Sequence, residues 1–115
     1  MILRFASASL LAATVAALLI STTACAAVDE DAAKALAKKN DCFKCHAVDK
    51  TKKGPSYKKI AAKYKGKADG QDKLVKNMTT GPKVKLDDGT EEDHKVIDTK
   101  DAAALKNLAD WILAQ

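Results

Sequence analysis

The sequence predicts an all-α fold of about four helices, and three observations support this prediction. Apolar residues recur at helical spacing in several segments, whereas the alternating pattern of β-strands is nowhere sustained. The 115 residues contain no internal repeat and have room for one domain. The 88 residues from Val28 onward include only 19 large apolar side chains, so a bound apolar group is needed to complete the core.

The N-terminal segment 1–27 predicts a secretory signal peptide. Arg4 precedes the apolar stretch Leu10–Ile20, and small residues follow. An apolar run of about a dozen residues is shorter than the ~20 that cross a bilayer, so no membrane span is expected after cleavage. An uncleaved anchor and lipidation at Cys25 are the alternatives. Export of this kind predicts a periplasmic location.

The mature domain is predicted to span 28–115. The small-residue rule for cleavage fits a mature start at Ala27 and nearly as well one at Val28. Removal of Arg4 leaves 19 lysines against 15 acidic residues, a balance of +4.

The first two helices are predicted before and after a Gly-Pro break. The first runs from Glu30 to Lys39, with Asp29 as N-cap, acidic residues in its first turn and lysines in its last. The second follows Gly54-Pro55 and is capped by Ser56. Its apolar positions lie at i, i+3, i+4 and i+7 before Gly66, namely Tyr57, Ile60, Ala61 and Tyr64.

Two further helices are predicted in the second half of the chain. The third lies near Gln71–Met78 and ends before Gly81-Pro82. The last begins with Asp98 as N-cap and Asp101 at the third helical position. Its apolar face comprises Ala104, Leu105, Leu108, Trp111 and Ile112. The polar segment from Gly81 to Thr99 is predicted to be a long loop, so that the domain has no sheet.

The motif Cys42-Phe43-Lys44-Cys45-His46 predicts a covalent haem site. Its spacing places two thiols on one turn, where each can add to one haem vinyl group, and directs the adjoining histidine to the iron. The alternatives are a disulfide, half of a zinc site or a thioredoxin-like redox pair. None of them explains the histidine, and the chain has neither a second cysteine pair nor a βαβ pattern.

The chain resembles the small bacterial class I cytochromes c over its whole mature region. Three segments carry the resemblance: Asp41–Asp49 with the haem motif, Gly54–Tyr57, and Leu108–Leu113. The resemblance implies a monohaem class I fold of about four helices and a one-electron carrier rather than an enzyme. It also implies that the Pro55 carbonyl accepts a hydrogen bond from His46, and that Trp111 packs on the first helix as part of the cofactor site.

The sixth iron ligand departs from the family pattern. The resemblance implies a methionine in a loop before the C-terminal aromatic residue, but His94 lies there, seventeen residues before Trp111. Met78 lies thirty-three residues before Trp111, on the apolar face of a predicted helix. We therefore predict bis-histidine ligation by His46 and His94 and a low reduction potential, with Met78 as the alternative.

An open sixth position is the third possibility. It predicts a protein that binds O2, NO or CO instead of a carrier, with a small peroxidase as a weaker variant of the same idea. Carbon monoxide binding to the reduced protein discriminates between the carrier and the gas-binding protein.

The segment Lys50–Lys67 carries eight lysines and no acidic residue. Because it flanks the predicted haem site, it favours docking to an acidic redox partner. A solvated basic helix face is the simpler interpretation. No nucleic-acid partner is expected, since the basic segment lacks a recognised binding module.

Overall fold

A computed structural model describes residues 27–115. The predicted signal peptide, apart from its last residue, and Cys25 lie outside the described residues. No helix within 27–115 has the length and apolar character needed to cross a membrane. The described chain contains α1 (Glu30–Lys39), η1 (Cys42–Lys44), α2 (Tyr57–Tyr64), α3 (Gly70–Thr80), β1 (Lys83–Lys85), β2 (Glu91–Asp93) and α4 (Ala102–Leu113).

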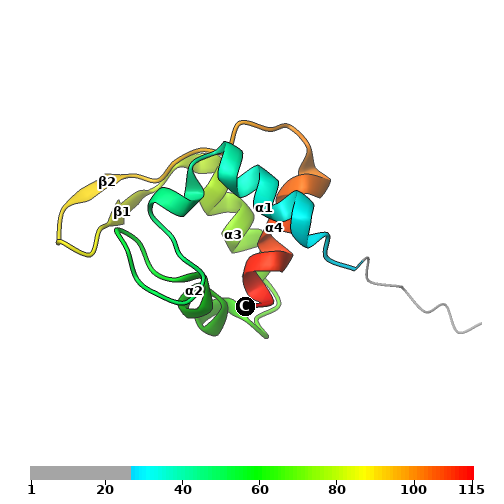
Figure 1. Cartoon of the computed structure of the whole chain (residues 1–115), viewed down its shortest axis with the longest axis horizontal. Helices are drawn as coiled ribbons and strands as arrows, with labels where there is room; N and C mark the ends of the chain where they lie inside the picture. Colours follow the sequence, from blue (N-terminus) through cyan, green and yellow to red (C-terminus); the bar gives the residue numbers. More distant parts are fainter. Residues whose placement is uncertain (1–26) are drawn as a thin grey trace, which may run out of the picture.

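The C-terminal helix α4 is the centre of the fold. It packs against α1, α2 and α3, and Figure 1 shows α1 crossing it closely. The crossing is close because α1 contributes only Ala33 and Ala37 to the core, both almost fully buried. From α4, Leu108 and Trp111 fill the space between the helices. The small all-α fold predicted from the sequence is thus confirmed, with four α-helices and little sheet.

The first two helices begin where their capping residues predict. The Asp29 carboxylate accepts a hydrogen bond from the Ala32 N–H at 2.9 Å, and the Ser56 hydroxyl accepts one from Lys59 at 3.1 Å. Side-chain caps of this kind satisfy backbone donors that have no partner within the helix. The third helix is slightly longer than predicted and ends at Gly81, whose left-handed φ of 59° stops it.

The prediction that Asp98 caps the last helix is wrong. Asp101 is the N-cap, and its carboxylate accepts hydrogen bonds from the Ala103 and Ala104 N–H groups at 3.0 and 3.1 Å. The backbone N–H of Asp98 donates instead to the Asn40 side chain at 3.0 Å. Both aspartates fit a capping pattern in the sequence, and Asp98 lies three residues before the observed cap.

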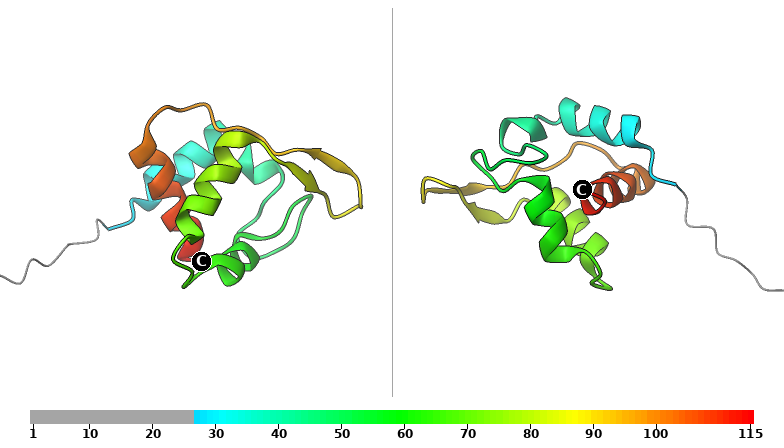
Figure 2. Two further views of the ribbon diagram at one scale, coloured as in Figure 1. Left: turned by 180° about the vertical axis from the view of Figure 1, so that it is seen from behind. Right: turned by 60° about the horizontal axis from the view of Figure 1, so that its bottom comes forward.

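The prediction of a domain without any sheet is also wrong. Residues 83–85 and 91–93 pair as a two-stranded antiparallel hairpin, with Lys83 opposite Asp93 and Lys85 opposite Glu91. Gly89, with a φ of 85°, provides the turn. Figure 2 shows the hairpin extending away from the helices. Strands of three residues are too short for alternation to be recognised in the sequence, although Asp88-Gly89 is a known hairpin signal.

Candidate cofactor site

A cavity of about 700 Å³ lies between the CxxCH segment, α2, α3 and the segment that follows β2. Six of the residues singled out in the sequence line it: Cys42, Cys45, His46, Pro55, Met78 and His94. The apolar part of the remaining wall includes Ile60, Tyr64, Leu74, Ile97, Leu108 and Ile112, and charged side chains such as Lys63, Glu92 and Asp93 also line the cavity. The fold thus brings the predicted ligands together around a space suited to a large apolar group.

The 3-10 helix η1 places the two cysteines on one turn. The Cys42 carbonyl accepts hydrogen bonds from the Cys45 N–H at 3.2 Å and from the His46 N–H at 3.0 Å. Both thiols are free and partly buried. Burial raises the pKa of the Cys42 thiol, so the thiol stays protonated at neutral pH. The chain enters this turn through Asp41, which adopts a left-handed φ of 57°.

His46 is held from behind by the Gly-Pro segment. Its Nδ1–H donates to the Pro55 carbonyl oxygen at 2.6 Å, as the resemblance implied. Because Nδ1 carries the proton, Nε2 keeps the lone pair that a metal ligand needs. Burial lowers the pKa of His46, and the nearby His94 lowers it further, so the imidazole is neutral at pH 7.

Two aromatic rings support His46. Tyr57 stacks on it with a centroid distance of 5.3 Å and an interplanar angle of 26°. Trp111 packs edge-on against Tyr57 at 5.2 Å and lies near Phe43, but it is not among the residues that line the cavity. Trp111 therefore supports the site from behind Tyr57. The sequence places Tyr57 on a helix face and in the Gly54–Tyr57 segment, but its stacking on His46 was not predicted.

The opposite wall carries His94. Its ring centroid lies 6.1 Å from that of His46, with the two rings tilted by 42°. The His94 Nδ1–H donates to the Lys95 carbonyl oxygen at 3.0 Å, which again leaves Nε2 with a free lone pair. Met78 also reaches this cavity from α3, as a core residue that is 6% exposed. Asn40 lies beside the site as well, and nothing in the sequence singled it out.

A helical domain with a Cys-x-x-Cys-His turn in the wall of an apolar cavity defines a small c-type haem protein. The sequence model of the family described as Cytochrome c matches residues 30–115. The chain belongs to this family.

Several relatives have names of the same kind. The chain is 41% identical over 78 residues to cytochrome c-552 of Nitrosomonas europaea, which covers 68% of this chain and 73% of that protein. It is 31% identical over 80 residues to cytochrome c-551 of Pseudomonas aeruginosa, covering 70% and 73%. The match to cytochrome c-551 of Allochromatium vinosum is 48% identical but spans only about half of that protein, 49%, and 40% of this chain.

Solved structures agree with the family assignment. The crystal structure of the class 1 cytochrome MtoD from Sideroxydans lithotrophicus ES-1 is 61% identical and superimposes with a TM-score of 0.73, covering 76% of this chain and 97% of that one. The wild-type cytochrome c552 of Nitrosomonas europaea is 36% identical with a TM-score of 0.56, covering 70% and 95%. The chain is therefore a class I monohaem cytochrome c, an electron carrier with one covalently attached c-type haem.

The residues around the cavity fit such a haem. The two partly buried thiols are unpaired and share a wall with a neutral histidine whose Nε2 is unprotonated. Gly54 leaves room for that histidine, since a Cβ at this position would come within 2.8 Å of His46 Cε1. The apolar side chains opposite the thiols suit the faces of a porphyrin.

Proposed function

We propose that this protein is a periplasmic one-electron carrier that attaches its haem through Cys42 and Cys45 and binds the iron through His46 and His94. When bound, the haem supplies a single iron that accepts and donates one electron. The chain supplies both ligand nitrogens in a fixed tautomer and an apolar wall that excludes water from them. Redox transfer without a bound substrate is the whole activity, so the protein is not an enzyme.

The paired geometry of the two histidines is the observation that carries this proposal. Imidazole nitrogens bind first-row metal ions at about 2 Å, so two imidazoles that share one ion have ring centroids about 6 Å apart. The observed 6.1 Å matches this separation. Each ring also donates its Nδ1–H to a backbone carbonyl, from Pro55 or Lys95, and so leaves its Nε2 with the lone pair that a metal ligand needs.

Met78 is the alternative ligand, and its surroundings favour a packing role. It belongs to the same buried cluster as Leu74, Ile97 and Leu108. Its backbone carbonyl accepts a hydrogen bond from the Ile97 N–H at 2.8 Å, which ties α3 to the segment after His94.

Replacing each candidate ligand separately tests the assignment. We expect His94→Ala to convert a low-spin haem spectrum to a high-spin one and to admit carbon monoxide to the reduced protein. The matched variant Met78→Leu conserves core volume and should leave both properties unchanged. The ligation proposal fails if His94→Ala stays low-spin, and rapid carbon monoxide binding by the unaltered protein would favour the gas-binding function.

A low reduction potential follows from the proposed ligands. Methionine ligation raises haem potentials relative to histidine, and negative charge near the iron favours the ferric state. Glu92 and Asp93 both line the cavity next to His94. We therefore expect the potential, measured by redox titration, to rise in His94→Met; an unchanged or lower value would argue against histidine as the native ligand.

The lysines of 50–67 are proposed to form the docking surface for an acidic redox partner. Lys58 and Lys59 are exposed on the first turn of α2, and Lys63 reaches the rim of the cavity. Lysines so close to the cofactor would speed encounter with negative partners at low salt. The double variant Lys58→Glu, Lys59→Glu should slow electron exchange with an acidic protein and reverse its salt dependence, whereas Lys106→Glu on α4 should not.

The periplasmic location is proposed from the first 27 residues. Expression of the full chain in a bacterium that matures c-type cytochromes should give a periplasmic haem protein whose mass corresponds to a start at Ala27 or Val28. A product that begins at Cys25 with a lipid attached would contradict this cleavage.

A further inference from the structure

The segment His94–Asp98 crosses the cavity from the hairpin toward α4, and it is held on two sides. On one side, backbone bonds join it to the end of α3: the His94 N–H donates to the Pro82 carbonyl oxygen and the Ile97 N–H to that of Met78, both at 2.8 Å. On the other side, the segment contacts Asn40 and Asp41, which directly precede the CxxCH motif, through hydrogen bonds and ion pairs of their side chains.

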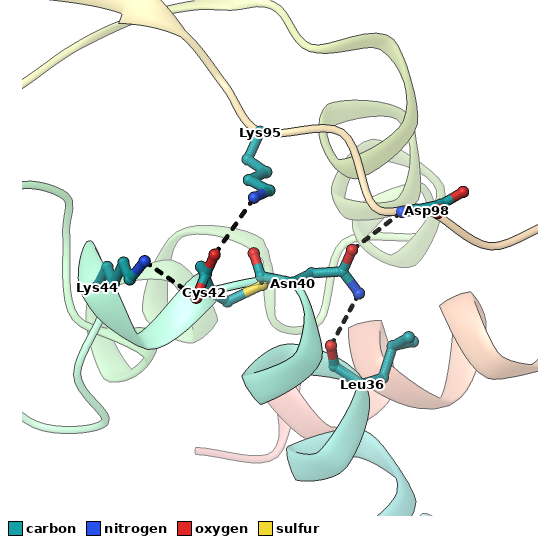
Figure 3. A network of polar contacts seen from close by, with 7 residues as sticks. Leu36, Asn40, Cys42, Lys44, Lys95 and Asp98 are labelled. Atoms are coloured by element: carbon teal, nitrogen blue, oxygen red, sulfur yellow. Dashed lines mark hydrogen bonds and ion pairs between the residues drawn. The ribbon is translucent and has the colours of Figure 1, made fainter.

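Asn40 makes the buried connection. The residue is only 4% exposed, although it lies at the end of α1. Its Oδ1 accepts a hydrogen bond from the Asp98 N–H at 3.0 Å, and its Nδ2 donates to the Leu36 carbonyl oxygen at 3.0 Å. Figure 3 shows the amide lying between the helix and the crossing segment. One side chain, two residues before Cys42, therefore links the end of α1 to the segment that carries His94.

A second, exposed connection lies beside it. The Lys95 ammonium lies 3.5 Å from the Asp41 carboxylate, which also pairs with Lys44 at 3.2 Å. Exposed ion pairs of this length contribute little because water screens them and both side chains lose freedom. The Asn40 amide is buried and bonded at both ends, so its loss would leave the Asp98 N–H without that partner. Asn40 is thus the stronger of the two connections.

We propose that Asn40 is a positioning residue that keeps His94 on the iron by holding the crossing segment against the CxxCH turn. This inference rests on the proposed ligation by His94. An external ligand can bind the iron only in molecules whose His94 has moved away, and its apparent affinity scales with the fraction in that open state. Breaking the Asn40 connection frees one side of the segment and raises that fraction.

Cyanide binding to the ferric holoprotein tests this role. We expect Asn40→Leu, which keeps the side-chain volume but removes both hydrogen bonds, to bind cyanide about tenfold faster, equivalent to about 1.4 kcal/mol in favour of the open state. Asn40→Asp retains the oxygen that accepts from Asp98 and should lie closer to the unaltered protein. If Asn40→Leu does not fold, Asn40→Ser, whose hydroxyl is one atom too short, must show the same increase.

The chain offers a matched control in Asn107. This asparagine also makes two hydrogen bonds to one distant segment, accepting from the Asp29 N–H and donating to the Asp29 carbonyl, both at 2.8 Å. Because it joins α4 to the start of α1, Asn107→Leu should lower the unfolding temperature without changing cyanide binding. Equal rates in the two leucine variants would overturn the inference.

The proposed ligation and the role of Asn40 fail in different ways. A low-spin His94→Ala variant rejects the ligation, whatever Asn40 does. A high-spin His94→Ala variant combined with unaltered cyanide binding in Asn40→Leu rejects the role of Asn40 alone.

Discussion

At the scale of single residues, the position of His46 depends on a neighbour that has no side chain. The backbone N–H of Gly54 donates to the Cys45 carbonyl at 2.9 Å, and a Cβ on Gly54 would come within 2.8 Å of His46 Cε1 and 3.2 Å of Nδ1. The His46 imidazole can occupy this position because residue 54 has no Cβ that would clash with it.

We predict that Gly54→Ala displaces the His46 ring and lowers the free energy of unfolding by about 1–3 kcal/mol, the usual cost of overpacking. Denaturant unfolding and the haem spectrum of the holoprotein measure the two effects. Gly66→Ala is the control, because its Cβ would meet nothing within 4 Å and only its φ of 77° is strained. It should lose stability and keep its spectrum; a normal spectrum in Gly54→Ala would contradict the prediction.

The charge of Asp41 leads to a prediction about how the stability of the fold depends on pH. Hydrogen bonding and attraction from Lys44 hold the pKa of the Asp41 carboxyl below its ordinary value, and Lys95 adds to this. A lowered folded-state pKa stabilises the protein above the unfolded-state pKa, and this stabilisation is lost as the pH falls through the folded-state value. Asn tolerates the left-handed backbone at this position about as well as Asp, so Asp41→Asn isolates the charge.

We therefore expect the wild type to unfold at a higher temperature than Asp41→Asn at neutral pH, and the difference to shrink as the pH falls below about 4. Thermal unfolding of both proteins across this range measures it. A difference that stays constant down to pH 2 would mean that the carboxylate charge is not the cause.

The individual residues of the site were predictable to different extents. Cys42, Cys45 and His46 follow from local spacing, whereas His94 follows from the ligand position that the resemblance to class I cytochromes implies; the structure places all four around one cavity. Asn40 gave no signal, because a polar residue at a helix end is ordinary and its partner Asp98 lies 58 positions away. Contacts of that kind depend on tertiary structure and leave no pattern in a single sequence.

At the scale of secondary structure, the contact between α1 and α4 depends on small side chains. Ala37 on α1 and Ala109 on α4 are fully buried, and Ala33 on α1 is 1% exposed. Helices approach this closely only when neither presents a bulky side chain at the crossing.

We predict that Ala37→Leu forces the two helices apart and destabilises the holoprotein by about 1–3 kcal/mol. Ala35→Leu makes the same change on the exposed face of α1 and should have almost no effect on stability. Chemical denaturation of the pair is the measurement. Similar unfolding midpoints for the two variants would show that the contact between α1 and α4 accommodates a leucine side chain without strain.

The secondary structure was predictable where local chemistry decides it. Asp29 and Ser56 cap the predicted helices, and Gly81 ends the third. The predicted start of α4 was wrong because Asp98 and Asp101 are equally suitable N-cap residues in the sequence. The hairpin was missed because its six strand residues include one apolar side chain, Val84, so no alternation marks them.

At the scale of the whole molecule, the cofactor completes the core. Residues of α2, α3 and α4 line part of a cavity of about 700 Å³, and its walls include Leu74, Leu108 and Ile112. Without an occupant, those side chains would face water or the helices would have to collapse inward, and either change costs free energy.

We predict that a chain unable to attach haem, Cys42→Ser with Cys45→Ser, loses cooperative unfolding while retaining some helix. Far-ultraviolet and near-ultraviolet circular dichroism during heating distinguish these features. The holoprotein with His94→Ala is the reference, since it keeps the attached group and changes only a ligand. A sharp thermal transition in the double serine variant would show that the polypeptide core is sufficient alone.

The composition of the hairpin has a consequence for self-association. A two-stranded sheet has two open edges, and exposed edges invite pairing with other chains. A symmetric dimer formed through β1 would bring Lys83 of one copy opposite Lys85 of the other, and one formed through β2 would oppose Glu91 and Asp93. Within one copy the same residues face opposite charges, since Lys83 pairs with Asp93 and Lys85 with Glu91. The charges of the hairpin therefore favour pairing within one molecule and oppose edge-to-edge pairing between two copies.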